Sequence, residues 1–196
     1  MSRGFIERVD NLGPQNTPVH YLAHHGVAKE SVTTPVRVVF DSSARLSEKA
    51  FSLNDCLHTG PSLVTDLTQM LLRFRCNRFA WVSDVEKAFL MVGLNERDRD
   101  ATRFLWPMDP LDTNSPYITY RFCAVLFGAT CSQFLLNAMI QKHLSIVKDD
   151  REVVRRLERG LYIDNLQGTA DDTVCLQKTI RDALKIIASA NLSLLE

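Results

Sequence analysis

Two acidic side chains, Asp84 and Asp164, stand in short apolar runs of the sequence at residues 80–85 and 161–166, and Asn165 follows the second acid. Because Asp and Asn tolerate left-handed backbone angles, we expect Asp164 and Asn165 to occupy the central positions of a tight β-hairpin. Such a turn would hold one carboxylate rigidly in solvent. Two carboxylates on adjacent strands are the arrangement with which two-metal enzymes hold a pair of magnesium ions. An isolated Asp-Asn pair, by contrast, is usually only a turn.

The elements that must position these acids are predicted from the patterns around them. β-Branched and apolar runs indicate strands at residues 36–40, 78–85, 102–106 and 117–125 and a hairpin over 162–169. Helical spacing and end signals predict helices over residues 61–75, 95–101, 128–147, 149–159 and 172–188. The first 34 residues are rich in Pro, Gly and Asn and suggest extended loops. Strands separated by helices, with antiparallel hairpins among them, favour an α+β fold over a doubly wound sheet.

Composition narrows the class of protein without identifying it. The 196 residues suit one domain or two small lobes, and a hydrophobic content of 45% indicates a folded chain. Five scattered cysteines form no metal-type pair, which fits reduced thiols. No apolar run suits a membrane span or a secretory signal, so we expect a cytoplasmic or nuclear protein with no membrane partner. Net charge is zero, which counts mildly against nucleic-acid binding unless the charges are segregated in space.

Asp84 and Asp164 belong to a longer series of motifs along the sequence. Residues 84–89, 127–132 and 162–165 occur in the order of palm motifs A, B and C of reverse transcriptases. Residues 21–30, 37–44 and 52–57 resemble the fingers motifs of the same family. The combination most closely resembles the reverse transcriptases of BEL/Pao-type LTR retrotransposons, and it covers the chain from about residue 4 to residue 196.

The resemblance implies the fingers and palm of a right-hand polymerase. Residues 1–78 would form a fingers-like region, and residues 79–196 a palm with a fingers insertion at about 95–125. An antiparallel palm sheet would pack on helices, and the thumb would be missing. The expected partners are an RNA or DNA template with its primer and deoxynucleoside triphosphates; the oligomeric state is not indicated.

The same resemblance implies roles for individual residues of the metal site. Asp84 and Asp164 would bind Mg²⁺, which Mn²⁺ can replace, with the carbonyl oxygen of Val85 as a further ligand. Asn165 completes the catalytic set, at the place where the family ordinarily carries a second aspartate. An amide oxygen is a weaker magnesium ligand than a carboxylate, so we expect reduced metal affinity. The alternative for Asp84 is a structural cap at a strand end.

Other residues match nucleotide-binding positions of the family. Arg37 would contact the triphosphate, Phe89 would reject a ribose 2′-hydroxyl, and Gly128 would admit template or nucleotide to the backbone. Lys29 is a weaker match for a second phosphate contact, and Tyr162 is expected to bind nucleic acid. Each has a simpler alternative: core packing for Phe89, a solvated charge for Lys29 and an ordinary turn for Gly128.

The chain departs from the family pattern at several positions. Besides Asn165, non-proline residues stand where prolines are usual, at Ala23, Leu126 and Gln133. Two functions therefore remain open: an RNA-directed DNA polymerase fragment that transfers nucleotides by a two-metal mechanism, or an inactive retroelement remnant that binds nucleic acid or protein. An unrelated two-metal nuclease or phosphatase would not explain the fingers motifs.

Overall fold

The chain folds into two compact units. The structure, a computed structural model, describes residues 4–10, 18–28, 35–148 and 151–195. The first unit comprises Met1–Thr59 and Gly93–Ser132, and the second comprises Gly60–Val92 and Gln133–Glu196. Residues 60–78, which the sequence analysis grouped with the N-terminal region, thus belong to the second unit, because helix α2 (Leu67–Phe74) packs against strand β8 (Asn165–Ala170). The predicted mixture of helices and antiparallel sheets is confirmed.

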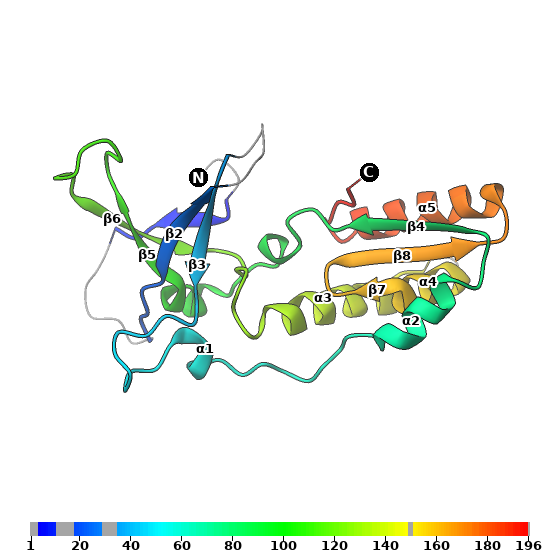
Figure 1. Cartoon of the computed structure of the whole chain (residues 1–196), viewed down its shortest axis with the longest axis horizontal. Coiled ribbons are helices and arrows are strands. Elements are labelled where there is room, and N and C mark those ends of the chain that lie inside the picture. The colour runs from blue at the N-terminus through cyan, green and yellow to red at the C-terminus, as the bar shows by residue number, and fades with distance from the viewer. Residues whose placement is uncertain (1–3, 11–17, 29–34, 149–150, 196) are drawn as a thin grey trace. The chain divides into compact units, whose positions relative to one another are not determined.

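The first unit contains two small antiparallel sheets (Figure 1). Strands β1 (Ile6–Arg8), β6 (Tyr117–Phe122) and β5 (Arg103–Pro107) form one in that order, and β2 (Ala23–Ala28) pairs with β3 (Val36–Asp41) in the other. Their connections include the short helix α1 (Leu53–Cys56) and the 3₁₀ helix η2 (Glu96–Thr102). The predicted strands at β3, β5 and β6 are confirmed, whereas β1 and β2 lie where extended loops were expected.

Aromatic rings fill the space between the two sheets of the first unit. The Phe40 ring lies 4.9 Å from that of Phe104 and 4.8 Å from that of Phe122, centroid to centroid. His24 stacks on Phe40 at 5.3 Å and on Trp106 at 5.4 Å. Such pairs stabilise a core beyond the area that they bury. His24 therefore packs between rings, which is why β2 forms despite its weak strand pattern.

The second unit is built on a three-stranded antiparallel sheet. Its strand order is β4 (Phe79–Asp84), β8 and β7 (Leu161–Tyr162). Helices α3 (Ser132–Ile146), α4 (Arg151–Gly160) and α5 (Thr173–Ala188) run alongside the sheet (Figure 1), and the 3₁₀ helix η1 (Ala88–Met91) follows β4. The largest fully buried apolar side chains described in this unit are Leu136, Ile140, Leu144, Leu157, Leu166, Ile186, Ile187 and Leu192. No helix in the described part of the chain is long and apolar enough to cross a membrane.

The starts of two helices differ from the sequence prediction, and one helix was not predicted. Helix α2 begins six residues later than predicted, because the carboxylate of Asp66 accepts the N–H of Gln69 at 2.7 Å and caps it. The helix predicted from residue 128 begins as α3 at Ser132, and Thr130, before its first residue, gives its N–H to Asn54 Oδ1 at 2.9 Å. The short helix α1 was not predicted, although Ser52 and Asp55 form its capping box.

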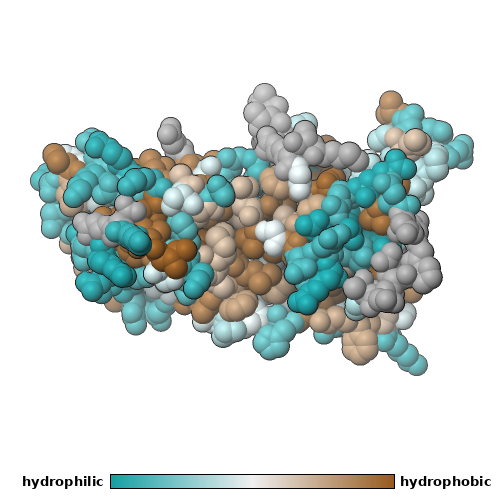
Figure 2. Space-filling view, turned by 180° about the vertical axis from the view of Figure 1, so that it is seen from behind, coloured by the Kyte–Doolittle hydropathy of each residue, from teal (hydrophilic) through white to brown (hydrophobic). Residues whose placement is uncertain are grey.

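Burial of apolar side chains is incomplete in both units. Val36 and Leu46 are exposed in the first unit, and Leu72 and Val82 are exposed in the second. Figure 2 shows one face of the molecule, on which apolar areas alternate with polar ones.

Gly160 fixes the join between helix α4 and the hairpin that carries Asp164. It is buried at the last position of α4, and a Cβ there would overlap the backbone carbonyl of Gln167 on β8. We therefore expect Gly160→Ala to lower the free energy of unfolding by about 3 kcal/mol, since the strand cannot move away without losing its ladder. Chemical denaturation measures this change.

Gly93 offers the matched control, because a Cβ at this position would meet no atom within 4 Å. Gly93→Ala should change the free energy of unfolding by no more than about 0.5 kcal/mol. Equal effects of the two substitutions would contradict the close approach of α4 to β8.

Candidate metal centre

The two predicted acids meet at one end of the sheet in the second unit. In the antiparallel register of β4 and β8, Asp84 lies opposite Asn165. The backbone N–H of Val85 donates to the carbonyl oxygen of Asp164 at 2.8 Å. The fold therefore brings together Asp84, Val85, Asp164 and Asn165, whose roles in metal binding and catalysis stay predictions.

The turn between β7 and β8 is shifted by one residue from the sequence prediction. Tyr162 pairs with Asn165, so the two central positions are Ile163 and Asp164 instead of Asp164 and Asn165. Ile163 has a φ of 57°, a left-handed angle that a β-branched residue rarely adopts. Such strain is found mainly where surrounding structure enforces a functional geometry. Asn165 is the first residue of β8 and lies in the ladder, not in the turn.

The electrostatics of the site favour a cation. Although Asp84 lies at the surface, partial burial of its carboxyl group and the negative charge of Asp164 raise its pKa, and a backbone hydrogen bond from Val85 partly offsets this. Neither Asp84 nor Asp164 forms an ion pair with a described residue. Lys87, three residues beyond Asp84, is paired with Glu86. The two carboxylates thus repel each other, and no cationic side chain in the described part of the chain is paired with either of them.

Asn165 supplies a hydrogen-bond donor where a third carboxylate would add charge. Its Nδ2 donates to Asp164 Oδ1 at 3.3 Å. The amide therefore holds the carboxylate of Asp164 while leaving its own oxygen as a neutral ligand.

The donor set fits a hard divalent cation that keeps several other ligands. Two carboxylates and a backbone carbonyl, that of Val85, are oxygen ligands of the type that magnesium prefers. The Val85 carbonyl already accepts the N–H of Ala88 at 3.2 Å, which leaves its second lone pair. No cluster of three or more His, Cys, Asp or Glu side chains suited to a metal occurs among residues 4–10, 18–28, 35–148 and 151–195. Water or substrate oxygens would have to complete the coordination.

A residue that the sequence analysis did not single out supports the strained turn. Asn137 on α3 is 1% exposed, and its Nδ2 donates to Gln133 O at 3.0 Å and to Ile163 O at 3.4 Å. Its Oδ1 is buried without a hydrogen-bond partner in the described structure. The signal was present in the sequence: Asn137 interrupts the apolar face of α3 formed by Leu136 and Ile140. A buried amide at this place positions the carbonyl beside Asp164.

Two predicted nucleotide-binding residues lie close together in the first unit. The guanidinium of Arg37 on β3 stands over the ring of Phe127, 5.6 Å from its centroid, and Gly128 follows Phe127 directly. Gly128 has a φ of 90°, and its carbonyl accepts Asn54 Nδ2 at 3.0 Å. A Cβ at position 128 would meet Phe40 O at 3.6 Å, an ordinary contact. The backbone angle, not lack of space, requires glycine here.

Three predicted site residues remain: Phe89, Tyr162 and Lys29. Phe89 lies in η1 and is 8% exposed, and Tyr162 is half-buried at the end of β7. The expected sugar gate and nucleic-acid contact stay predictions. Lys29 lies outside the described residues.

The raised pKa of Asp84 predicts that this acid opposes folding at neutral pH. The folded-state pKa exceeds that of the unfolded chain, so stability is lost as pH rises through the folded value. Without divalent cations, Asp84→Asn should therefore raise the melting temperature at pH 7, and the gain should vanish below the ordinary carboxyl pKa. Thermal melts at the two pH values test this.

A matched variant separates the two causes of that shift. Asp164→Asn removes the neighbouring charge and should lower the pKa of Asp84 in an NMR titration. An unchanged pKa would mean that the two carboxylates do not interact.

Loss of the Asn137 side chain should destabilise the turn. We expect Asn137→Ala to lower the free energy of unfolding by about 2 kcal/mol, because it removes a buried donor from two carbonyls. Hydrogen exchange at Asp164 and Asn165 should accelerate with it. Gln141 lies one turn further along α3, is exposed and donates to Leu63 O at 3.1 Å. Gln141→Ala should change stability by no more than about 0.5 kcal/mol, and a loss equal to that of Asn137→Ala would contradict a specific role for Asn137.

The chain was compared with protein families, curated proteins and solved structures, and only the solved structures gave a match. No protein family matches the chain by sequence, and no curated protein matches it. The crystal structure of native prototype foamy virus protease-reverse transcriptase is similar with a TM-score of 0.68 and 14% identity, covering 97% of this chain and 21% of that chain. The selenomethionine-labelled CSH mutant of that protein gives a TM-score of 0.67, again at 14% identity, over 98% of this chain and 21% of that chain. This chain, which spans about a fifth of the length of those proteins, has a reverse-transcriptase-like fold.

Proposed function

We propose that this chain is the fingers and palm portion of an RNA-directed DNA polymerase, with the first unit as fingers and the second as palm. The observation that carries the proposal is the pairing of Asp84 with the Asp164 hairpin in a reverse-transcriptase-like fold. The finer assignment to BEL/Pao-type retrotransposons rests on the motif resemblance in the sequence.

The proposed reaction is template-directed nucleotidyl transfer. The primer 3′-oxygen forms a bond to the α-phosphorus of a deoxynucleoside triphosphate, and the bond to the departing pyrophosphate breaks. Asp84, Asp164 and the carbonyl of Val85 would hold magnesium, which supplies positive charge for the attacking and leaving oxygens. Asn165 would orient the carboxylate of Asp164 through its Nδ2 hydrogen bond.

The other predicted residues would bind the substrates. Arg37, held over Phe127, would contact the triphosphate, for which a planar guanidinium is suited. Phe89 would exclude a ribose 2′-hydroxyl by bulk, and Tyr162 would contact nucleic acid beside the turn. The left-handed backbone at Gly128 would present the main chain to template or nucleotide.

Asn165 favours a second candidate function, that of an inactive remnant that binds nucleic acid or a protein. Replacement of a carboxylate by an amide removes one negative charge from the site and weakens magnesium binding. The fold and the turn would survive this replacement, since Asn165 lies in the β8 ladder.

Primer extension on poly(rA)/oligo(dT), with magnesium or manganese, tests the proposed reaction. Incorporation by the wild-type chain should fall more than about 100-fold in Asp84→Ala, because loss of a metal ligand removes several kcal/mol of transition-state stabilisation. Asn165→Asp should lower the magnesium concentration needed for half-maximal incorporation.

The control is Asp182→Ala, an acid on α5 outside the metal centre, which should leave incorporation unchanged. Incorporation that survives Asp84→Ala would overturn the assignment of the metal centre. Absence of incorporation with both metals, in the wild type and in Asn165→Asp alike, would favour the inactive remnant.

A further inference from the structure

The part of the chain that follows α5 comes back to the end of β4, and we call its residues 192–195 the return segment. β4 is the edge strand of its sheet, whose order is β4-β8-β7. Val85, directly after β4, forms an antiparallel bridge with Leu194 of the return segment. Figure 1 shows the chain after α5 beside the tip of β4. A further run of backbone thus pairs with the sheet at the place where Asp84 stands.

A tight turn at the end of α5 directs the return segment. Asn191 has a φ of 58°, and its N–H donates to the carbonyl of Ala188 at 2.9 Å. The N–H of Leu192 donates to the carbonyl of Ile187 at 3.3 Å. These two bonds around a left-handed residue form a Schellman motif, in which asparagine is one of the preferred residues. Leu192 and Ile187 are buried, whereas Asn191 is exposed, so the turn depends on the backbone angle of Asn191.

The peptide group that joins Asp84 to Val85 is hydrogen-bonded on both sides. Its N–H donates to the carbonyl of Asp164 in the hairpin at 2.8 Å. Its carbonyl accepts the N–H of Leu195 in the return segment, also at 2.8 Å. The N–H of Glu86 donates to another carbonyl of the return segment at 2.8 Å. Because a peptide group is planar, this last bond also fixes the direction of the Val85 carbonyl, the proposed metal ligand.

The hydroxyl of Ser83 ties the return segment to β4. Its Oγ donates to the carbonyl of Leu195 at 2.5 Å. In the β4–β8 register Ser83 lies opposite Leu166, which is buried. Successive side chains of a strand point to opposite faces, so the Ser83 hydroxyl and the Asp84 carboxylate lie on different faces of the sheet. Ser83 therefore acts on the return segment and is not a ligand of the metal centre.

From these contacts we propose that the return segment positions the metal centre, with Ser83 and Asn191 as the positioning residues. The hairpin holds the backbone of Asp84 and Val85 from one side, and the return segment holds it from the other. Magnesium demands near-ideal geometry from its ligands, and partners that orient those ligands raise its affinity. The inference rests on the proposed metal centre, and it assigns the placement of the Asp84 carboxylate and the Val85 carbonyl to residues outside that centre.

Manganese binding by the whole chain tests the role of Ser83. Mn²⁺ alone is titrated in, the free ion is measured by electron paramagnetic resonance, and Asp84→Ala identifies the binding that belongs to the metal centre. Ser83→Ala should raise the Kd of that binding about tenfold, the lower end of what loss of an orienting partner costs. Ser83→Thr keeps the hydroxyl and should bind as the wild type does. Hydrogen exchange at Glu86 and Leu195 should accelerate in Ser83→Ala but not in Ser83→Thr.

The turn after α5 provides an independent pair of variants, because the side chain of Asn191 is exposed. A β-branched residue opposes the left-handed backbone, so Asn191→Val should raise the Kd for Mn²⁺ about as much as Ser83→Ala does. Glycine adopts the same angle without strain, and Asn191→Gly should leave the Kd unchanged.

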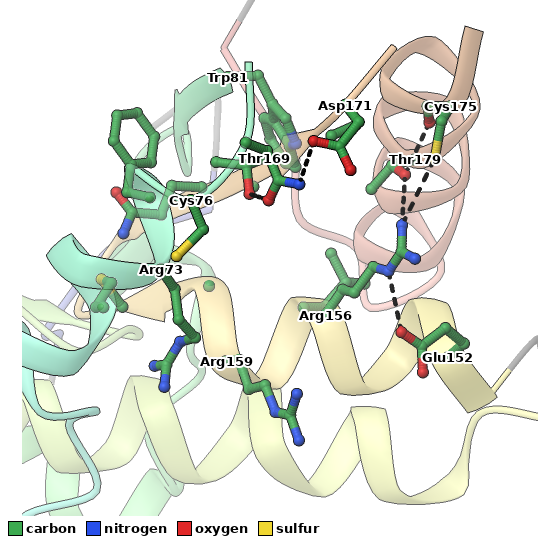
Figure 3. A pocket seen from close by; sticks show the side chains of 18 of the residues that line it. Arg73, Cys76, Trp81, Glu152, Arg156, Arg159, Thr169, Asp171, Cys175 and Thr179 are labelled. Atoms are coloured by element: carbon green, nitrogen blue, oxygen red, sulfur yellow. Dashed lines mark hydrogen bonds and ion pairs between the residues drawn. The ribbon is translucent and has the colours of Figure 1, made fainter. Parts of the chain in front are cut away.

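Thr169→Val is the matched control for a general loss of stability. Thr169 lies on β8 opposite Ala80, and its hydroxyl donates to Asn77 Oδ1 at 2.9 Å. Figure 3 shows it in the wall of a cavity near the other end of the sheet from Asp84. The substitution thus removes a hydroxyl hydrogen bond from the same sheet, and the Kd for Mn²⁺ should equal that of the wild type.

The positioning role is overturned if Ser83→Ala binds manganese as tightly as the wild type, if Ser83→Thr fails to restore the Kd, or if Thr169→Val weakens binding equally. Manganese binding by the wild type that is unchanged in Asp84→Ala would remove the metal centre itself, and with it the proposed function. Binding that responds to Ser83→Ala in a chain without primer extension would support the positioning role and count against the proposed reaction alone.

Discussion

The hydrogen-bonded register between β4 and β8 is the constraint on which the candidate metal centre depends. Because side chains alternate between the faces of a strand, a slip of one residue would turn Asp84 away from the Asp164 hairpin. Close packing holds the register: Trp81 lies against Gly168, where a Cβ would collide with the indole. The same pairing places Trp81 in the wall of a cavity near the other end of these strands. One ladder thus brings the two acids together at one end of the sheet.

The metal centre is held in an arrangement that the rest of the second unit must stabilise. Two uncompensated carboxylates and a left-handed isoleucine each oppose folding. The apolar core beneath the sheet and the amide of Asn137 counteract them, the latter by binding the carbonyl of Ile163. A cation bound by Asp84 and Asp164 would remove the repulsion, so occupation of the site and folding stability should be linked.

The sequence predicted what depends on local pattern and missed what depends on distant partners. Apolar runs indicated β4 and the β7–β8 hairpin, and Asp172 marked the start of α5 correctly. The turn position was wrong by one residue, because Asp and Asn both favour turns and the pairing of Tyr162 with Asn165 decides between them. Strand β2 was missed because its stability comes from β3 and from the stacking of His24 on aromatic rings. Asn137 was overlooked because its partner lies 26 residues away along the chain.

Compared with an aspartate at the same position, Asn165 alters the charge of the site and leaves the pairing of β7 and β8 unchanged. An aspartate at this position would face Asp84 across the ladder and lie next to Asp164, so three negative charges would gather where two now repel. Such a cluster binds divalent cations more strongly and destabilises the cation-free chain further. The amide instead donates to Asp164 and leaves the strand pairing intact. With asparagine at this position, the folded hairpin depends less on a bound cation. The turn can therefore form whether or not the site binds metal.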